Sequence, residues 1–177
     1  MTQIDFSKID LKDLACLIYE TLKNSGINAV LVGGACVSIY SKNRYQSYDL
    51  DFATFEELKN IETALKKIGF KREGRCFSHP KCIYLIDFVN PPIAIGHEPI
   101  HHFEVLSTQS GSLQLLTPTD SVKDRLASYF HWNDEQALEQ ALLVAQNHEI
   151  DLKDLKRWSK EEGFISLFEH FLKQLHS

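Results

Sequence analysis

The pattern of apolar and polar positions predicts a chain that alternates strands and helices up to about residue 117 and is helical afterwards. Apolar residues recur at helical spacing between Asp10 and Ser25, and Gly26 ends that predicted helix. The same reasoning predicts further helices over residues 35–40, 55–68, 119–130, 134–147, 151–162 and 164–175. Short apolar or alternating runs predict strands over residues 29–32, 49–53, 82–89, 103–106 and 113–116.

This order of elements favours an α/β (α+β) fold, in which a mixed β-sheet with helices is followed by a C-terminal helical bundle. Pro118 marks the change in composition. We therefore expect an α/β domain over residues 1–117 and a helical region over residues 118–177 packed on it. Within the helical half, we expect Trp132 to lie in the core or between the two halves rather than to stack on a base.

The most informative stretch is the apolar run of residues 29–32 followed by Gly33, Gly34 and Ala35. Two glycines at the end of a strand let the backbone adopt positive φ and approach a ligand without a Cβ in the way. If a helix starts near Ala35, its free N–H groups point back toward this corner and suit a phosphate. The stretch therefore predicts a phosphate-binding corner.

Two aspartates, Asp49 and Asp51, flank Leu50 on the next predicted strand. Side chains two positions apart on a strand leave from the same face, so the two carboxylates are expected to lie close together. Such a pair repels itself unless a cation lies between, and Mg²⁺ bound by one or two carboxylates and substrate phosphates fits this requirement. Two surface aspartates without a function are the alternative.

Gly33-Gly34 followed by Ser47-x-Asp49-Leu50-Asp51-Phe52 resembles the signature of the nucleotidyltransferase superfamily, and in particular its abortive-infection toxin branch (AbiEii/AbiGii-like). The resemblance implies transfer of a nucleoside monophosphate from a nucleoside triphosphate such as ATP, with Mg²⁺ or Mn²⁺ held by Asp49 and Asp51. The spacer over residues 35–48 is slightly longer than this family commonly has. The acceptor implied is a hydroxyl of RNA (a tRNA 3′ end) or of a protein, and a small molecule stays open.

The resemblance also implies a third acid on a neighbouring strand, and Asp87 is the residue at that place, as metal ligand or as base for the attacking hydroxyl. A hydrogen-bonded aspartate at a strand end is the alternative for Asp87. By the same resemblance Lys123 contacts phosphates and Asp134 lies near the cleft. Because Lys123 is followed by Asp124 and then Arg125, whether Lys123 or Arg125 binds phosphate stays open, as does an exposed, salt-bridged helix.

Two groups of basic residues outside these motifs each allow two interpretations. Lys42 and Arg44 in the predicted loop either reach the triphosphate or are solvated. Six basic residues between positions 66 and 81 either hold a polyanion such as RNA or form the basic end of a helix and a loop. We expect His97, His101 and His102 to be loop residues rather than metal ligands, since Pro99 lies among them.

Composition narrows the function classes. The net charge of −5 and the pI near 5.9 disfavour broad, non-specific nucleic-acid binding. No apolar run approaches the roughly 20 residues of a membrane span, and no signal pattern begins the sequence, so no membrane association is expected. Four cysteines without C-x-x-C spacing suit a reducing, cytoplasmic environment.

The sequence thus predicts a metal-dependent nucleotidyltransferase, with a role as the toxin of a toxin–antitoxin or phage-defence system and a cognate antitoxin as partner. A catalytically inactive protein of the same fold that binds nucleotide or a partner, in an antitoxin-like or scaffold role, is the alternative. The acidic helical half, with 7 basic and 11 acidic residues over residues 118–177, is the feature that favours a basic partner.

Overall fold

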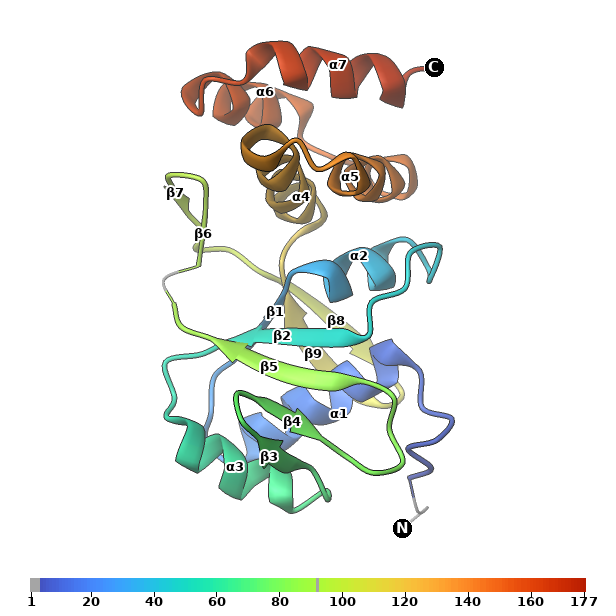
Figure 1. The fold of residues 1–177 in the computed structure, drawn as a ribbon, viewed down its shortest axis with the longest axis vertical. Helices are drawn as coiled ribbons and strands as arrows, with labels where there is room; N and C mark the ends of the chain where they lie inside the picture. The colour runs from blue at the N-terminus through green and yellow to red at the C-terminus, as the bar shows by residue number, and fades with distance from the viewer. Residues whose placement is uncertain (1–3, 92) are drawn as a thin grey trace.

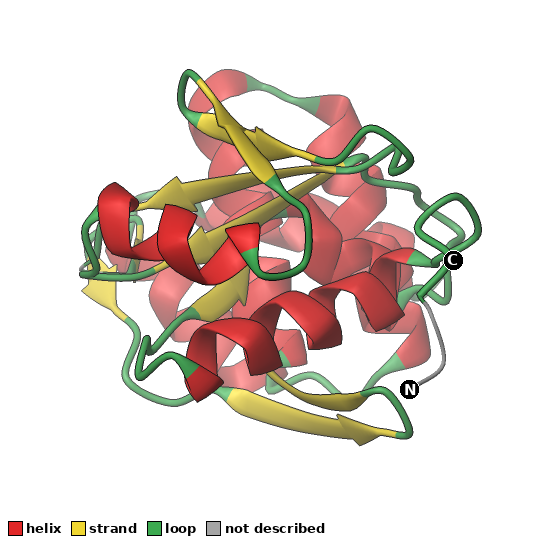
Figure 2. Cartoon of the chain, turned by 90° about the horizontal axis from the view of Figure 1, so that it is seen from below, coloured by secondary structure: helices red, strands yellow, loops and turns green. Residues whose placement is uncertain are grey.

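A computed structural model of the protein describes residues 4–91 and 93–177 (Figure 1). Seven helices are present in these ranges: α1 (Leu11–Asn24), α2 (Gly34–Tyr40), α3 (Leu58–Lys66), α4 (Pro118–Trp132), α5 (Glu135–Asn147), α6 (Leu152–Glu161) and α7 (Ile165–Leu175). None of them is long and apolar enough to cross a membrane. Seen from below, the strands run between helices in front of them and helices behind them (Figure 2).

Seven strands form the main sheet, in the order β3-β4-β5-β2-β1-β9-β8. Their bounds are β1 (Val30–Val32), β2 (Asp49–Ala53), β3 (Lys71–Glu73), β4 (Cys76–Ser78), β5 (Leu85–Val89), β8 (Glu104–Thr108) and β9 (Gly111–Leu115). The sheet is mixed, because β2 pairs in parallel with β5 and β1 pairs in parallel with β9, whereas the other pairs are antiparallel. The predicted fold class is confirmed.

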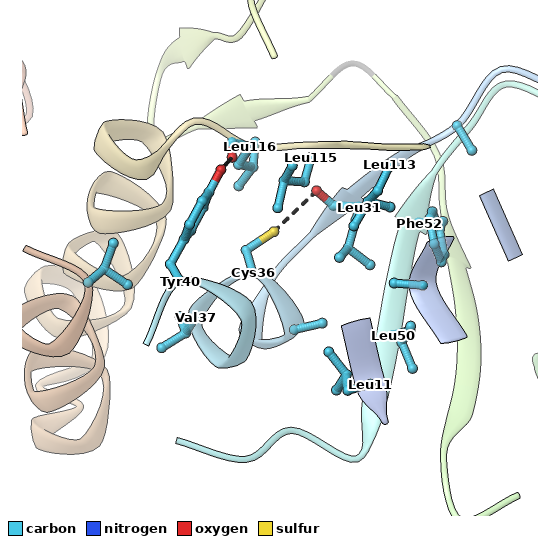
Figure 3. Close-up of a cluster of buried hydrophobic side chains, with 14 of the residues drawn as sticks. Leu11, Leu31, Cys36, Val37, Tyr40, Leu50, Phe52, Leu113, Leu115 and Leu116 are labelled. Atoms are coloured by element: carbon cyan, nitrogen blue, oxygen red, sulfur yellow. Dashed lines mark hydrogen bonds between the residues drawn. The ribbon is translucent and has the colours of Figure 1, made fainter. Parts of the chain in front are cut away.

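The hydrophobic core lies against one set of alternating strand residues. Leu31, Leu50 and Phe52 are fully buried and pack with residues of α1 and α2 (Figure 3). Figure 3 also shows the Tyr40 hydroxyl donating to the carbonyl oxygen of Leu116, at 2.5 Å, which ties the end of α2 to the chain just after β9. Because side chains alternate along a strand, the residues between these core positions face the other side of the sheet.

The last four helices follow the final strand. Thr117 caps α4 by accepting a hydrogen bond from the backbone N–H of Asp120, and Pro118 occupies the first helical turn, where its missing N–H costs little. Trp158 of α6 is buried and stacks on Phe130 of α4. The expectation for Trp132 is wrong, because this last residue of α4 is 82% exposed.

A small two-stranded sheet, β6 (Ala94–Ile95) with β7 (Glu98–Pro99), packs against the C-terminal helices. The Trp158 indole donates to the carbonyl oxygen of Ile95, and Glu162 accepts from the backbone N–H of His97 at 2.7 Å. No strand was predicted here from the sequence, because strands of two residues are too short to show alternation. His97 is thus bonded to a carboxylate in a turn, consistent with its expected place in a loop.

Three boundaries differ from those expected from the sequence. Helix α3 begins at Leu58, not near residue 55. The Thr54 hydroxyl donates to the carbonyl oxygen of Asn28 and accepts from the backbone N–H of Glu56, in a turn that precedes the helix. Strand β5 begins at Leu85 rather than Cys82. The basic stretch of residues 66–81 is not a helix end and a loop alone, since it contains the β3–β4 hairpin, whose charged residues carry no apolar alternation.

Candidate functional site

The corner between β1 and α2 has a backbone that only glycine adopts easily. Gly33 has φ +70° and ψ −152°, a region essentially closed to side-chain-bearing residues. A Cβ added to Gly33 would also lie 3.0 Å from Oδ2 of Asp51. The glycine therefore lets the chain turn and lets the Asp51 carboxylate approach the backbone of the corner.

Gly34 is the first residue of α2, and the loop after α2 folds back toward it. A Cβ on Gly34 would lie 3.4 Å from the Tyr45 hydroxyl oxygen and 3.6 Å from Oγ of Ser47. The Ser38 hydroxyl accepts a hydrogen bond from the backbone N–H of Ser47, which fixes this return. Ala35 is buried in the first turn of α2. Two hydroxyl groups thus lie beside the corner, and the sequence pattern pointed to neither as a site residue.

The three expected acids come from two adjacent strands. Asp51 of β2 pairs directly with Asp87 of the parallel strand β5, and with Val32 of β1 on its other side. Directly paired residues of neighbouring strands point to the same face, so Asp51 and Asp87 lie side by side. Asp49, two residues before Asp51, shares this face and is exposed. The structure brings the three acids and Gly33 to one place.

The side of β5 that carries Asp87 is open to solvent. Its neighbours Leu85 and Val89 are 40% and 37% exposed, so the face is open rather than packed. The Asp87 carboxylate is half-buried and accepts a hydrogen bond from the backbone N–H of Phe88 at 2.8 Å. An acid on this face keeps part of its hydration.

Burial raises the pKa of Asp51, and the negative charges of Asp87 and Asp49 raise it further. Among the described residues, no lysine, arginine or histidine forms an ion pair with any of these three carboxylates. Like charges gathered without a counter-charge oppose folding. This arrangement is what a cation site requires, because a bound cation removes the repulsion.

The described residues contain no group of three or more His, Cys, Asp or Glu side chains already arranged around a metal position. Mg²⁺ is commonly held by one or two carboxylates with the remaining ligands supplied by substrate phosphates and water. Asp51, unpaired and half-buried between Gly33 and Asp87, fits such shared coordination. The donor set therefore suits a metal that arrives with a nucleotide.

A cleft of about 230 Å³ opens over this face of the sheet. It is lined by Gly33 and Asp51, by residues that follow β5, and by Asp124 of α4. Arg125 donates from Nε to Asp124 at 3.0 Å and from a terminal nitrogen to Gln140 at 3.3 Å. The Arg125 charge opposes the rise in the pKa of Asp51, which Asp124 adds to. Asp124 was not expected as a site residue.

Lys123 lies in a different environment from Arg125. Its side chain is only 2% exposed, and its ammonium group is 2.6 Å from Asp154, 2.9 Å from Glu98 and 3.8 Å from Asp120. Burial would lower the pKa of Lys123, but the hydrogen bonds to Asp154 and Glu98 raise it overall. Three carboxylates therefore already bind this cation. Of the two basic residues between which the sequence left the choice open, Arg125 is the one beside the cleft.

The other expected binding residues lie outside the cleft lining. Lys42 and Arg44 are exposed in the turn that follows α2, and neither lines the cleft. Asp134 is exposed and caps α5, accepting from the backbone N–H of Ala137 at 3.1 Å. A helix cap fully accounts for this position of Asp134.

The six basic residues between positions 66 and 81 are all exposed. They lie at the end of α3, along the edge strand β3 and in the segments around β4. Strands β4 and β5 separate β3 from β2, so this basic edge is two strands away from the Asp49–Asp51 pair.

Comparison with known structures identifies the architecture. The chain superposes on an antigenic nucleotidyltransferase-like protein from Paracoccidioides brasiliensis with a TM-score of 0.59 and 13% identity, over 76% of this chain and 74% of the other. The fold is nucleotidyltransferase-like. The antibiotic-resistance factor ANT(2″)-Ia matches in two structures with TM-scores of 0.51, one of them in complex with adenylyl-2″-tobramycin.

The two ANT(2″)-Ia structures share 10% and 12% identity with this chain and cover 86% and 98% of it, and 93% and 97% of their own lengths. At these identities the likeness extends to the nucleotidyltransferase-like fold and no further. No protein-family model matches the sequence, and no curated protein matches it significantly by sequence. The branch of the superfamily suggested by the sequence motif therefore stays a prediction.

Proposed function

We propose that the protein is a metal-dependent nucleotidyltransferase that transfers a nucleoside monophosphate from a nucleoside triphosphate to a hydroxyl group. The single observation that carries the proposal is the meeting of Asp49, Asp51 and Asp87 on one face of the sheet, beside the Gly33 corner and without a cationic side chain paired to them. A nucleotidyltransferase-like fold around that face supports it.

In this proposal Asp49 and Asp51, with Asp87, hold Mg²⁺ or Mn²⁺ together with the phosphates of the substrate. When bound, the divalent cation neutralises phosphate charge that the three carboxylates would otherwise repel. The backbone of Gly33, Gly34 and Ala35 lies against the phosphates, and Arg125 supplies a guanidinium beside the cleft, where Lys123 is already bound by three carboxylates. Positioning and charge neutralisation are the main sources of rate in such transfers.

The transfer step involves one proton and one displacement. The acceptor hydroxyl oxygen forms a bond to the α-phosphorus, the bond from that phosphorus to the bridging oxygen breaks, and pyrophosphate leaves. Asp87, which is half-buried and hydrogen-bonded only to its neighbour's backbone, takes the hydroxyl proton. The half-buried Asp51, whose pKa is raised, stays ionised once a cation is present.

The acceptor hydroxyls suggested by the toxin branch, a tRNA 3′ end or a protein side chain, remain predictions of the sequence resemblance, as does a role with a cognate antitoxin. The basic edge at β3 is the only described surface that favours RNA, and it lies two strands from β2. A structural neighbour of this fold is in complex with adenylyl-2″-tobramycin, so a small-molecule acceptor stays among the proposed acceptors.

The test is to incubate the purified protein with each of the four α-labelled nucleoside triphosphates, Mg²⁺, and either total RNA, a protein extract or a metabolite extract. The proposal expects release of pyrophosphate and transfer of label to one of the three fractions, with loss of both in Asp49→Asn and Asp51→Asn. A lack of turnover with all four nucleotides, combined with nucleotide binding, would instead support the alternative of an inactive nucleotide- or partner-binding protein.

That alternative is favoured by one observation, the absence of a ready-made metal cluster among the described residues. The two readings differ in how metal and nucleotide depend on each other. An enzyme should bind Mg²⁺ tightly only when the triphosphate is present. A scaffold protein should keep its affinity for its partner in the Asp51→Asn variant.

A further inference from the structure

A second cavity lies beside the carboxylate cleft. Its volume is about 510 Å³, within the range of small-molecule sites. It is lined by the start of β1, the end of β2 and the segments just before β6 and after β7. Ala53 and Ile93 line both this cavity and the carboxylate cleft, so the two spaces share a wall. We call it the side pocket.

The side pocket lies on the same face of the sheet as the three acids. Val30 and Ala53 are directly paired across β1 and β2, and Ala53 is two residues after Asp51 on the same strand. Two residues of strand span about 7 Å, so a molecule in the side pocket lies within reach of the Asp51 carboxylate. A reaction between two substrates needs two adjoining binding sites, so that the reacting atoms come together. The cleft and the side pocket adjoin in this way, because Ala53 and Ile93 line both.

The lining of the side pocket is largely apolar. Phe55, Ile93, Ile100 and Phe103 supply much of its lining, and Phe55 is 85% exposed at the rim. Among the described residues that line it there is no lysine, arginine, aspartate or glutamate. Gln114 lies within it, and its side-chain amide makes no hydrogen bond to another described residue. Asn28, Thr54 and the exposed His101 also line it. Largely apolar walls with a few polar groups suit a neutral ligand with few polar groups of its own.

We infer that the side pocket binds the acceptor, and that the acceptor is a neutral, largely apolar small molecule that carries a hydroxyl group. This inference rests on the proposed nucleotidyl transfer and assigns its second substrate. Among the described lining residues, a polycationic acceptor finds no carboxylate, and an RNA strand finds no lysine or arginine to neutralise its phosphates. The hydroxyl of a bound acceptor points toward the wall shared with the cleft, on the side of Asp51 and its strand partner Asp87.

Binding is measured with prodan, a neutral naphthalene fluorophore whose emission shifts in apolar surroundings. We expect saturable binding of one prodan per protein. Gln114→Trp fills the side pocket with an indole ring and should weaken binding by roughly tenfold or more. The control, Gln109→Trp, makes the same exchange in the exposed turn of the same β8–β9 hairpin and should leave binding unchanged. Phe55→Ala removes an exposed side chain that the fold does not need, and should weaken binding several-fold.

Competition decides the ligand class. Neutral apolar alcohols should displace prodan, whereas tobramycin, adenosine and a short RNA oligonucleotide should not. Displacement by adenosine would make the side pocket the nucleobase site and overturn the inference, as would displacement by tobramycin or RNA. Equal prodan affinity in the wild-type protein and Gln114→Trp would overturn it as well.

The outcome is separable from the proposed function. Asp51→Asn should keep full prodan binding, because Asp51 lines the cleft and not the side pocket. Prodan binding without any nucleotide turnover would reject the transferase and leave the pocket's ligand class standing. Turnover without prodan binding would reject the inference alone. In the active protein, Gln114→Trp should raise the KM for an apolar acceptor while nucleotide affinity stays unchanged.

Discussion

Gly33 and Asp51 approach each other so closely that a Cβ on Gly33 would lie 3.0 Å from Oδ2 of Asp51. The contact joins the corner after β1 to the acid of β2, and the antiparallel pairing of Val32 with Asp51 fixes it. Gly33 thus has two roles. Its positive φ allows the chain to turn, and its lack of a side chain leaves space for the Asp51 carboxylate.

Gly33→Ala should abolish nucleotidyl transfer and cost about 1–3 kcal/mol of unfolding free energy, because the side chain is strained at this φ and displaces the Asp51 carboxylate. Chemical denaturation and turnover assays measure the two effects. Gly26→Ala is the control, since Gly26 also has positive φ but nothing within 4 Å of an added Cβ. It should lose stability and keep the turnover of the folded protein; a similar loss of turnover there would contradict the contact with Asp51 as the cause.

Asp51→Asn should stabilise the protein without ligands while it abolishes turnover. Removing a carboxylate held near two others relieves repulsion, which we expect to be worth about 0.5–2 kcal/mol at pH 7. The folded-state pKa of Asp51 is raised, so the unfolded chain loses this proton first as the pH rises. The contribution of Asp51 to stability therefore falls as the pH rises from near 3.8, its unperturbed pKa, through its folded pKa.

Unfolding curves of both proteins across this pH range test the sign. The stability advantage of Asp51→Asn should be absent below the unperturbed pKa, grow above it, and level off once Asp51 is ionised in the folded state. An advantage that shrinks with rising pH would contradict a raised pKa. Asp134→Asn serves as the control, because Asp134 is an exposed helix cap away from the cleft lining.

The sequence predicted the strand at the centre of the candidate site and did not predict the residues around it, for a physical reason. Asp49–Ala53 was predicted to the residue, since a buried alternating strand leaves a strong pattern. The pairing of Asp51 with Asp87 depends on the strand order β5-β2-β1, which no local pattern contains. The same holds for Asp124, whose place in the cleft depends on how α4 rotates when Val122 and Leu126 are buried.

Lys123 shows the opposite case, a residue whose sequence context suggested a site and whose packing suggests a structural role. Lys123 is a cation whether it binds phosphate or stabilises the fold. What separates them is the burial of the ammonium against Glu98, Asp154 and Asp120, and two of these acids come from β7 and α6, distant in sequence. Only the tertiary structure brings them to Lys123.

Lys123→Met should therefore destabilise the fold by about 3–5 kcal/mol, because it leaves carboxylates together without their cation. At a temperature where the variant is still folded, its KM for nucleotide should be close to that of the wild-type protein. Thermal unfolding and steady-state kinetics give the two numbers. A raised KM with unchanged stability would show instead that Lys123 contacts the nucleotide. The matched control is Lys153→Met, which lies on α6 beside Asp154 and forms no ion pair with another described residue.

Removal of the metal should show that nucleotide binding and turnover depend on the divalent cation. With the chelator EDTA, we expect no turnover and little stabilisation by a triphosphate, since the three carboxylates then repel its phosphates. With Mg²⁺ and nucleotide at about 100 times the dissociation constant, the wild-type protein should gain about 2.7 kcal/mol of stability. Asp51→Asn should gain far less. Equal stabilisation of the wild-type protein by nucleotide with and without Mg²⁺ would contradict shared coordination.

Arg125→Gln tests the role of the positive charge beside the cleft. Arg125 is paired with Asp124, which lines the cleft with Asp51, so its removal both takes away a guanidinium and leaves Asp124 without its counter-charge. We expect the KM for nucleotide to rise by about tenfold or more, because a hydrogen bond to a charged group is worth about 1.5–3 kcal/mol. The double variant Asp124→Asn with Arg125→Gln separates the two effects. If the guanidinium acts on phosphate, the double variant keeps the raised KM, and if it only neutralises Asp124, the double variant recovers the wild-type KM.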